Sequence, residues 1–159
     1  MKVKDCMTEK VVTVSRATTL TELIELFRKH NFHTLPVVEA DNKVAGIVTF
    51  EDILKVFQPY SQEVARMLEA TPLVEKVEEE DILLADISGE MGMLVIVDDL
   101  INTRFVTVSQ ESSIEEARAL MKLHRLPRLP VVKNGGFLKG IISLFDIILA
   151  VFKEKGIIK

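Results

Sequence analysis

The sequence predicts an α/β (α+β) protein made of two copies of one β-α-β-β-α unit, packed around a pseudo-twofold axis. The first observation is an internal repeat: a constant offset of 94 residues aligns residues 3–54 (the first copy) with residues 97–148 (the second copy) without a gap. Of the 52 aligned pairs, 17 are identical. The second observation is the hydrophobic pattern, which alternates between strand and helix periods within each copy. A unit this short buries too little apolar surface alone, so we expect the copies to pack together.

Each copy is predicted to open with a strand followed by a helix. β-branched runs at residues 11–14 and 105–108 favour the strand. Apolar residues on one helical face predict the helix in the first copy: Leu20, Leu23, Ile24 and Phe27. The corresponding residues in the second copy are Ile114, Ala117 and Met121. The residues that would form a capping box at the helix start are Thr19 with Glu22 and Ser113 with Glu116.

A hairpin and a second helix complete each copy. The predicted hairpin strands are residues 35–38 and 44–48 in the first copy and 129–132 and 138–142 in the second. The turns contain Asp41-Asn42 and Asn134-Gly135-Gly136, which are residue types that tolerate positive φ. The final helices are expected to begin near Thr49 and Ser143.

An acidic segment separates the copies. Residues 55–96 hold nine acidic and three basic residues. Residues 61–70 have a helical pattern, a further helix could be capped at Thr71-Pro72, and residues 91–97 fit a helix or a strand equally well. The predicted organisation is therefore a first repeat at 1–57, a partly helical segment at 58–93, and a second repeat with a C-terminal helix at 94–159.

Composition and charge argue against several classes of function. The chain has 159 residues and a formal net charge of −4, whereas nucleic-acid-binding domains are usually strongly basic. The single cysteine, Cys6, excludes an internal disulfide and a zinc site built from cysteines. His30 and His33 lack a third metal ligand, so no metal site is expected. Apolar runs are shorter than the roughly 20 residues of a membrane span, so we expect a cytoplasmic protein without a membrane partner.

Four short motifs recur in both copies. They are Val-x-Asp at residues 3–5 and 97–99, Val-Thr-Val at 12–14 and 106–108, Leu-Pro-Val-Val at 35–38 and 129–132, and Gly-Ile-hydrophobic-[Ser/Thr]-x-x-Asp at 46–52 and 140–146. In this combination the chain resembles a tandem pair of CBS domains, named after cystathionine β-synthase, of the stand-alone prokaryotic type. The resemblance implies a compact pseudo-dimeric module that binds AMP, ADP, ATP or S-adenosylmethionine in a cleft, and pairs into a homodimer through its helices.

The repeated aspartates, Asp52 and Asp146, have a chemistry that suits an adenosyl ligand. An ionised carboxylate has two acceptor oxygens and can accept hydrogen bonds from both hydroxyls of a ribose. Both aspartates lie near a predicted helix N-terminus, where backbone N–H groups favour anions. The alternative is that each Ser/Thr-x-x-Asp is a plain capping box that needs no ligand.

The resemblance places an [Ser/Thr]-x-x-Asp motif of one copy beside the opening strand of the other. The better nucleotide site would contain Thr8, Val12, Thr13, Arg128, Ile142, Ser143 and Asp146. Arg128 would reach the phosphates, so a triphosphate would gain most there. The weaker site would contain His33, Thr34, Val48, Thr49, Asp52, Asn102, Val106 and Thr107. Because Thr34 stands where the second copy has Arg128, this site is expected to hold phosphate poorly.

The function predicted from these residues is ligand sensing. The duplicated positions assemble no nucleophile, general base and oxyanion donor, and the chain lacks both the Walker-type and the dinucleotide-binding glycine motifs, so no enzyme activity and no required cofactor are expected. A bound adenosyl molecule would favour one packing of the copies, and an unidentified protein partner would read that packing. The alternative is an interaction or scaffold protein that has the fold but binds no ligand.

Overall fold

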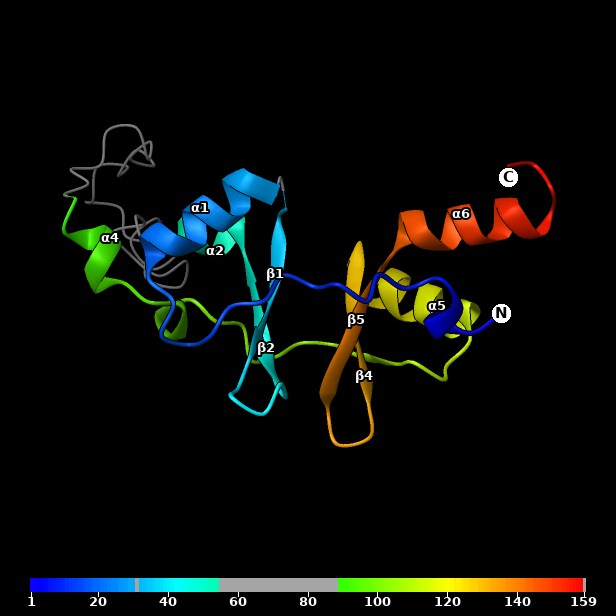
Figure 1. The fold of residues 1–159 in the computed structure, drawn as a ribbon, viewed down its shortest axis with the longest axis horizontal. Coiled ribbons are helices and arrows are strands. Elements are labelled where there is room, and N and C mark those ends of the chain that lie inside the picture. The colour runs from blue at the N-terminus through cyan, green and yellow to red at the C-terminus, as the bar shows by residue number, and fades with distance from the viewer. Residues whose placement is uncertain (31, 55–88, 159) are drawn as a thin grey trace, which may run out of the picture. The chain divides into compact units, whose positions relative to one another are not determined.

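The structure is a computed structural model that describes residues 1–30, 32–54 and 89–158. In the first copy the elements are α1 (Leu20–His30), β1 (Thr34–Val38), β2 (Val44–Thr49) and α2 (Phe50–Leu54) (Figure 1). In the second copy they are β3 (Val108–Ser109), α5 (Ile114–His124), β4 (Arg128–Lys133), β5 (Phe137–Ser143) and α6 (Leu144–Glu154). Three further short helices are η1 (Val3–Asp5) and η4 (Val97–Asp99), each of which begins a copy, and α4 (Met91–Leu94), which precedes the second copy. The mixed α/β class and both predicted hairpins are confirmed.

The helices α1 and α5 begin at the predicted capping boxes. The backbone N–H of Glu116 donates to the Ser113 hydroxyl over 3.2 Å, and the N–H of Ser113 donates back to the Glu116 carboxylate over 2.9 Å. Thr19 and Glu22 make the same reciprocal pair, over 3.3 and 2.9 Å. These bonds satisfy N–H groups that a helix start otherwise leaves without a partner.

Both hairpins turn through residues with positive φ. Asn42 has a φ of 67°, and at the offset of 94 residues Gly136 has a φ of 85°. β1 pairs with β2 in a two-stranded sheet, and β3, β4 and β5 form a three-stranded sheet in which β3 is parallel to β4 and β4 antiparallel to β5. The turn residues predicted from composition are therefore confirmed at these positions.

The opening strands predicted at residues 11–14 and 105–108 are wrong for most of their length. Strand pairing begins only at Val14, which bridges to Val37, and at Val108, the first residue of β3. Val14 donates to the Pro36 carbonyl over 3.1 Å and accepts from the Val38 N–H over 2.9 Å. To extend this parallel ladder, the carbonyl two residues earlier would need the N–H of Pro36, which proline lacks. Pro130 has the same place in the second copy, so β-branched composition alone overestimated both strands.

Residues 91–97, whose sequence fitted a helix or a strand equally well, begin with a helix. Residues 91–94 form α4, and residues 97–99 form the 3-10 helix η4. The helix predicted at residues 61–70 and the cap predicted at residues 71–72 lie outside the described residues. The structure therefore resolves the alternative at residues 91–97 in favour of two short helices.

The chain divides into two compact units, and each unit mixes residues of both copies. One unit contains Met1–Ser15, Leu35–Ile47 and Asn102–Lys159, and the other contains Arg16–Thr34 and Val48–Ile101. The segments at residues 1–8 and 95–102, here called the opening segments, account for part of this mixing. Each opening segment docks on the copy to which it does not belong by sequence.

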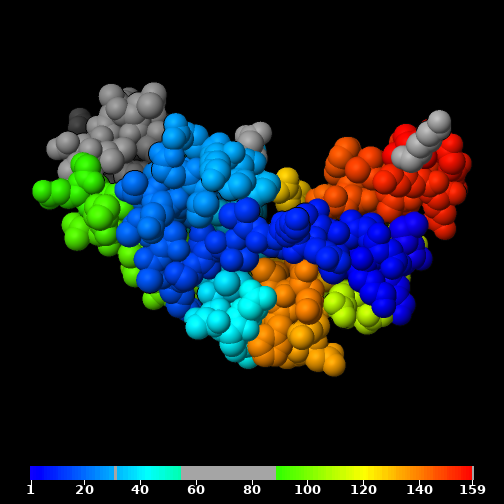
Figure 2. Space-filling model, in the orientation of Figure 1, coloured from blue at the N-terminus to red at the C-terminus, as the bar shows by residue number. Residues whose placement is uncertain are grey.

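The first opening segment docks on the second copy, within the unit that contains α5 and α6 (Figure 1). The N–H of Val3 donates to the Ser112 carbonyl over 2.9 Å, and the Val3 side chain is fully buried. Thr8 and Ile141 exchange two backbone hydrogen bonds of 2.9 Å. The space-filling view shows this segment, in dark blue, against the residues of the second copy (Figure 2). The backbone of Thr8 can approach β5 this closely only because residue 140 is glycine: a Cβ there would lie 2.8 Å from the Thr8 carbonyl oxygen.

The second opening segment repeats this docking on the first copy, within the other unit. The N–H of Val97 donates to the Thr18 carbonyl over 2.8 Å, and Val97 is fully buried. The N–H of Leu20 donates to the Val95 carbonyl over 2.8 Å. These bonds match, at the offset of 94 residues, those that Val3 and Ile114 make in the first unit. The internal repeat is therefore a repeat of contacts as well as of sequence.

Buried apolar residues from the opening segment and the second copy form one core. The fully or nearly buried members are Val3, Val108, Ile114, Ala117, Met121, Leu129, Val131, Ile142 and Ile147. Burying a valine or isoleucine side chain contributes about 1.5–3 kcal/mol, so Val3 is a substantial part of this core. Among the described residues, no helix combines the length and apolar character needed to cross a membrane.

Two lysines of the first opening segment hold Glu111 of the second copy. The Lys2 ammonium lies 2.7 Å and the Lys4 ammonium 2.9 Å from the Glu111 carboxylate. The hydrogen bond from Lys2, followed by that from Lys4, lowers the pKa of Glu111 from 4.5 to about 2. The depressed pKa means that these contacts stabilise the fold at pH values above 4.5, and that their contribution is lost as the pH falls through about 2.

The exchange of opening segments predicts crossed effects of two matched substitutions. Val3→Ala should destabilise the second copy, and Val97→Ala the first, each by about 2 kcal/mol because a buried side chain loses two methyl groups. Hydrogen exchange measured by mass spectrometry should show faster exchange at residues 128–150 in Val3→Ala and at residues 20–30 in Val97→Ala. Faster exchange confined to residues 20–30 in Val3→Ala would contradict the docking described above.

The lysine contacts predict the titration of Glu111. In carbon-detected NMR the Glu111 carboxyl should titrate near pH 2, and in the double variant Lys2→Met, Lys4→Met its midpoint should return towards 4.5. Glu115 is a control that the double substitution should leave unchanged, because its own backbone N–H and Ser113 lower its pKa. An unchanged Glu111 midpoint in the double variant would show that the lysines do not hold it.

Candidate functional site

Ser143 and Asp146 join the end of β5 to the start of α6. Ser143 is the N-cap of α6, and its hydroxyl accepts from the Asp146 N–H over 3.1 Å. In return the Ser143 N–H and hydroxyl donate to the Asp146 carboxylate over 2.7 and 2.6 Å. The capping box therefore exists, as the interpretation of this motif as a helix cap predicts.

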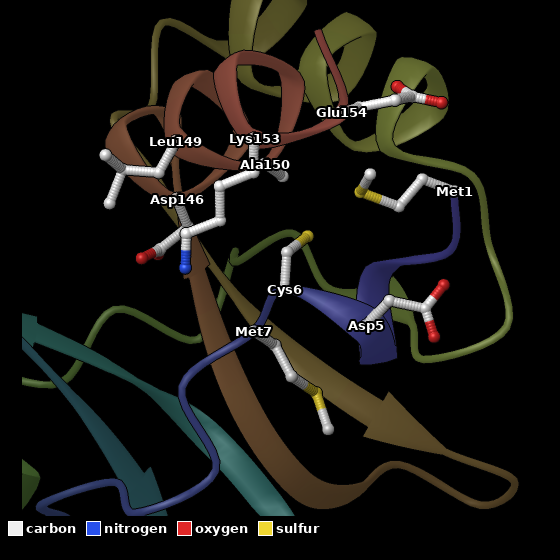
Figure 3. Close-up of a pocket in the computed structure, with 9 residues that line it drawn as sticks. All are labelled: Met1, Asp5, Cys6, Met7, Asp146, Leu149, Ala150, Lys153 and Glu154. Atoms are coloured by element: carbon white, nitrogen blue, oxygen red, sulfur yellow. The ribbon is translucent and has the colours of Figure 1, made fainter. Parts of the chain in front are cut away.

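The cap uses only one oxygen of the Asp146 carboxylate. Both bonds from Ser143 end on Oδ2, and Oδ1 accepts no hydrogen bond from any described residue. Asp146 is also half-buried and lines a cavity of about 350 Å³ (Figure 3). An ionised carboxylate oxygen that stays without a donor next to a cavity can accept hydrogen bonds from a bound molecule.

Two predicted site residues flank Ser143. Thr8 pairs with Ile141 along β5, and Arg128, the first residue of β4, is opposite Ser143 in the β4–β5 register. The N–H of Leu144, the first residue of α6, donates to the Pro127 carbonyl over 3.0 Å and ties the strand entry to the helix start. The structure thus brings Thr8, Arg128 and Ser143 together around the end of β5.

The other predicted residues of this site have different surroundings. Ile142 is fully buried in the core, so its side chain packs against the sheet and α-helices instead of facing the cavity. Val12 and Thr13 are half-buried in the stretch between Thr8 and Val14. Of the seven predicted residues only Asp146 lines the cavity.

The cavity has two walls. One wall is a single face of α6 with residues at the spacing i, i+3, i+4, i+7 and i+8: Asp146, Leu149, Ala150, Lys153 and Glu154. The other wall belongs to the first opening segment and contains Met1, Asp5, Cys6 and Met7. Sequence analysis missed these residues apart from Asp146. Helical periodicity counted onward from Asp146 would have indicated the α6 wall.

Cys6 is a neutral part of the second wall. Burial raises the pKa of its thiol, and the nearby carboxylates of Asp146 and Asp5 raise it further. The thiol therefore stays protonated at neutral pH and is a poor nucleophile. Cys6 packs against the edge of the core, which is a structural role.

The first copy repeats the capping box with a more buried carboxylate. The Thr49 N–H and hydroxyl donate to the Asp52 carboxylate over 2.8 and 2.7 Å. Asp52 is only 4% exposed, whereas Asp146 is half-buried beside a cavity. His33 and Phe50 form a tilted ring pair 5.7 Å apart next to this helix start, where the second copy has Pro127 and Leu144.

The remaining predicted residues of the Asp52 site fall in different parts of the chain. Thr34 begins β1 and Val48 is fully buried in β2. Asn102 exchanges backbone hydrogen bonds with Ile47 over 2.9 and 3.1 Å, as Thr8 does with Ile141. Val106 packs against the core of the second copy, and Thr107 beside it is half-buried.

A family model of the CBS domain matches residues 3–59 and 97–153. The chain belongs to the CBS domain family. This confirms the resemblance that rested on the repeated motifs, and the two matches correspond to the two copies.

Known proteins similar to the chain include tandem CBS proteins. The CBS domain-containing protein YhcV of Bacillus subtilis is 30% identical over 145 residues, which is 91% of this chain and 81% of that protein. The crystal structure of CBSX2 of Arabidopsis thaliana in complex with AMP is similar with a TM-score of 0.69 and 22% identity, over 97% of this chain and 98% of that one. The CBS domain pair of protein MJ0100, in complex with 5'-methylthioadenosine and S-adenosyl-L-methionine, has a TM-score of 0.65 and 19% identity, over 98% of both chains. The similarity to these two structures shows that they have the same fold as this chain.

Proposed function

We propose that the protein is a sensor module that binds an adenosyl ligand at Asp146 and passes the ligand state to a partner protein. Ligands considered are AMP, ADP, ATP and S-adenosylmethionine. The protein itself would catalyse no reaction and would need no cofactor. Its membership of the CBS family and the cavity beside Asp146 support this function.

The observation that carries the proposal is the hydrogen bonding of Asp146. A pure capping aspartate needs one acceptor oxygen, and Ser143 already occupies Oδ2 with two donors. Oδ1 accepts no hydrogen bond from a described residue, and Asp146 lines a cavity whose volume lies within the roughly 300–1,000 Å³ typical of small-molecule sites. A ribose presents hydroxyl donors that a charged oxygen binds more strongly than a neutral one does.

Two proteins with a similar fold support our choice of ligand class. CBSX2 was crystallised with AMP, and the MJ0100 domain pair with 5'-methylthioadenosine and S-adenosyl-L-methionine. The three molecules share the adenosine group and differ in what the ribose carries at its 5' carbon. An adenosyl ligand is therefore our choice for the Asp146 site of this chain.

A second, weaker adenosyl site at Asp52 stays part of the proposal. Thr34 stands there in place of Arg128, so the site has one cation fewer for a phosphate. The burial of Asp52 also leaves less of its carboxylate accessible than that of Asp146. We expect ligand to fill the Asp146 site first.

The ligand state would reach the partner protein through thermodynamic linkage between ligand binding and the docking of the first opening segment. A ligand shifts a conformational equilibrium by as much as its affinity differs between the two states. The first opening segment forms one wall of the cavity and is at the same time docked on the second copy. A ligand that contacts this wall would therefore couple its occupancy of the cavity to the docking of the segment. A protein partner that recognises this region would respond to the ligand.

Pairing of two chains through α6 is a further part of the proposal. Four uncharged side chains form a stripe along the exposed face of α6: Leu144 (43% exposed), Phe145 (64%), Ile148 (40%) and Phe152 (41%). A contiguous apolar stripe on a helix usually marks an interaction surface. In a twofold dimer the stripe would pack against its own copy, which needs no complementary charge.

Binding to the purified protein tests the adenosyl proposal. Calorimetry with AMP and 5'-methylthioadenosine should give a saturable isotherm for the wild type, and Asp146→Asn should weaken binding about tenfold or more. Asparagine retains one carbonyl oxygen for the cap but replaces the second acceptor with an NH₂ donor, so the ribose bond is lost while α6 keeps its start.

Asp99→Asn is the matched control. Asp99 caps η4 through the N–H of Ile96 over 3.0 Å and does not line the cavity, so this variant should bind like the wild type. Thermal unfolding without ligand should give similar midpoints for both variants. Absence of binding to any of AMP, ATP, 5'-methylthioadenosine or S-adenosylmethionine would favour the alternative, an interaction protein that acts through surfaces such as the α6 stripe.

A further inference from the structure

We infer that charged side chains select which opening segment docks on which copy. The crossed docking in the structure pairs opposite charges. Uncrossed docking, in which each segment would bind the copy to which it belongs by sequence, would pair like charges. The selection is independent of the proposed function. It gives a role to exposed ion pairs that contain Lys2, Lys4 and Glu111 in one unit and Arg16 and Asp98 in the other.

The buried and backbone contacts of the two docking sites are alike. Each segment buries one valine completely, at residues 3 and 97. At the next residue, the N–H of Lys4 donates to the Gln110 carbonyl over 3.1 Å, and the N–H of Asp98 donates to the Arg16 carbonyl over 2.9 Å. Gln110 and Arg16 are equivalent at the offset of 94 residues. Because every residue here supplies the same main-chain groups, these contacts would accept either segment.

The charges at the two docking sites are opposite in sign. In one unit the ammonium groups of Lys2 and Lys4 lie 2.7 and 2.9 Å from the Glu111 carboxylate, so the segment is the positive partner. In the other unit the Asp98 carboxylate lies 2.6 Å from the Arg16 guanidinium, so the segment is the negative partner. At the offset of 94 residues, the pairs that differ in charge are Lys2/Ile96, Lys4/Asp98, Arg16/Gln110 and Ala17/Glu111.

Uncrossed docking would bring like charges together. The ammonium groups of Lys2 and Lys4 would lie beside Arg16, and the Asp98 carboxylate would lie beside Glu111. An exposed ion pair changes an equilibrium roughly two- to fivefold at most, and a pair of like charges acts in the opposite direction by a similar factor. Three attractive pairs replaced by three repulsive ones should therefore favour crossed docking roughly tenfold or more.

Chain length would permit uncrossed docking. Asn102 exchanges backbone hydrogen bonds with Ile47 of β2, and Val14 bridges to Val37 of β1. If Thr8 took the place of Asn102, the chain from Thr8 to Val14 would cross three strand spacings, about 14 Å in total. The six residue steps between them can span up to about 20 Å. The linker therefore leaves the choice to the contacts at the docking sites.

The choice of segment also decides what lines the Asp146 cavity. Cys6 and Met7 of the first opening segment line it, and their equivalents in the second are Leu100 and Ile101. Uncrossed docking would thus replace a thiol and a flexible thioether with two branched hydrocarbon side chains. Charges on the exposed surface of the docking site therefore fix the composition of the cavity wall.

Exchanging the charged residues between the segments tests the selection without changing composition or net charge. This segment-exchange variant carries Lys2→Ile, Lys4→Asp, Ile96→Lys and Asp98→Lys. In methyl-labelled NMR, NOEs from Val3 to Ile114 report crossed docking, and NOEs from Val3 to Leu20 report uncrossed docking, because Leu20 is the equivalent of Ile114. The wild type should show the first set alone, and the segment-exchange variant should show the second set in about a tenth of the molecules or more.

A full-exchange variant and an apolar control complete the test. The full exchange adds Arg16→Gln, Ala17→Glu, Gln110→Arg and Glu111→Ala to the segment exchange, and it should restore crossed docking because opposite charges meet again. The apolar control exchanges one uncharged pair through Cys6→Leu and Leu100→Cys. It should keep the wild-type NOEs, since it leaves every charge in place.

Each outcome decides for or against the selection. Crossed NOEs alone in the segment-exchange variant, whatever its thermal midpoint, would overturn it, because the charges would then stabilise docking without choosing the segment. Uncrossed NOEs in the apolar control would also overturn it, since apolar fit would then make the choice. If the segment-exchange variant does not fold, the full exchange decides: crossed NOEs there support charge selection, and failure to fold there overturns it.

Discussion

The docking of each opening segment on the opposite copy is the constraint on which the rest of the structure depends. Val3 fills the core of the second copy, and the paired bonds of Thr8 and Ile141 hold the segment along β5. This places Met7 and Cys6 beside the start of α6 and forms the second wall of the Asp146 cavity. Without the docked segment, Asp146 would face solvent on that side, and a bound molecule would lose the contacts with that wall. Stability of the second copy and formation of the candidate site therefore have the same physical origin.

Asp146 shows how one residue can satisfy a structural need and remain available for binding. Its Oδ2 atom accepts both donors of Ser143, which caps α6, while Oδ1 accepts no hydrogen bond from a described residue and Asp146 lines the cavity. The capping and ligand-binding interpretations of the repeated motif are thus compatible in the second copy. In the first copy the same cap surrounds an aspartate that is almost completely buried. The same motif therefore lies in two environments of different accessibility, which supports the proposal that the two sites are unequal.

Much of the fold was predictable because its signals are local. Capping boxes such as Ser113 with Glu116 and positive-φ residues such as Asn42 act within a few residues of chain, and they marked helix starts and turns correctly. The prediction of the opening strands was wrong because β-branched composition gives no information about the partner strand. On that strand Pro36 and Pro130 lack the N–H that a longer ladder would need, and the pairing that makes this matter cannot be read from the sequence. The crossed docking was not predictable from the repeat, since an offset of 94 residues does not say on which copy a segment docks. The cavity residues Met1, Lys153 and Glu154 lie outside the aligned copies, so the duplicated pattern carried no signal for them.

A crystal structure of the protein with 5'-methylthioadenosine tests the central claim most directly, because this ligand carries the adenosine group without a charged tail. We expect density for the ligand in the cavity between α6 and the first opening segment, with a ribose hydroxyl within about 2.5–3.0 Å of Asp146 Oδ1 and the Ser143 bonds to Oδ2 retained. Ligand bound elsewhere, with Oδ1 still lacking a donor, would show that Asp146 is a helix cap alone and would contradict the account.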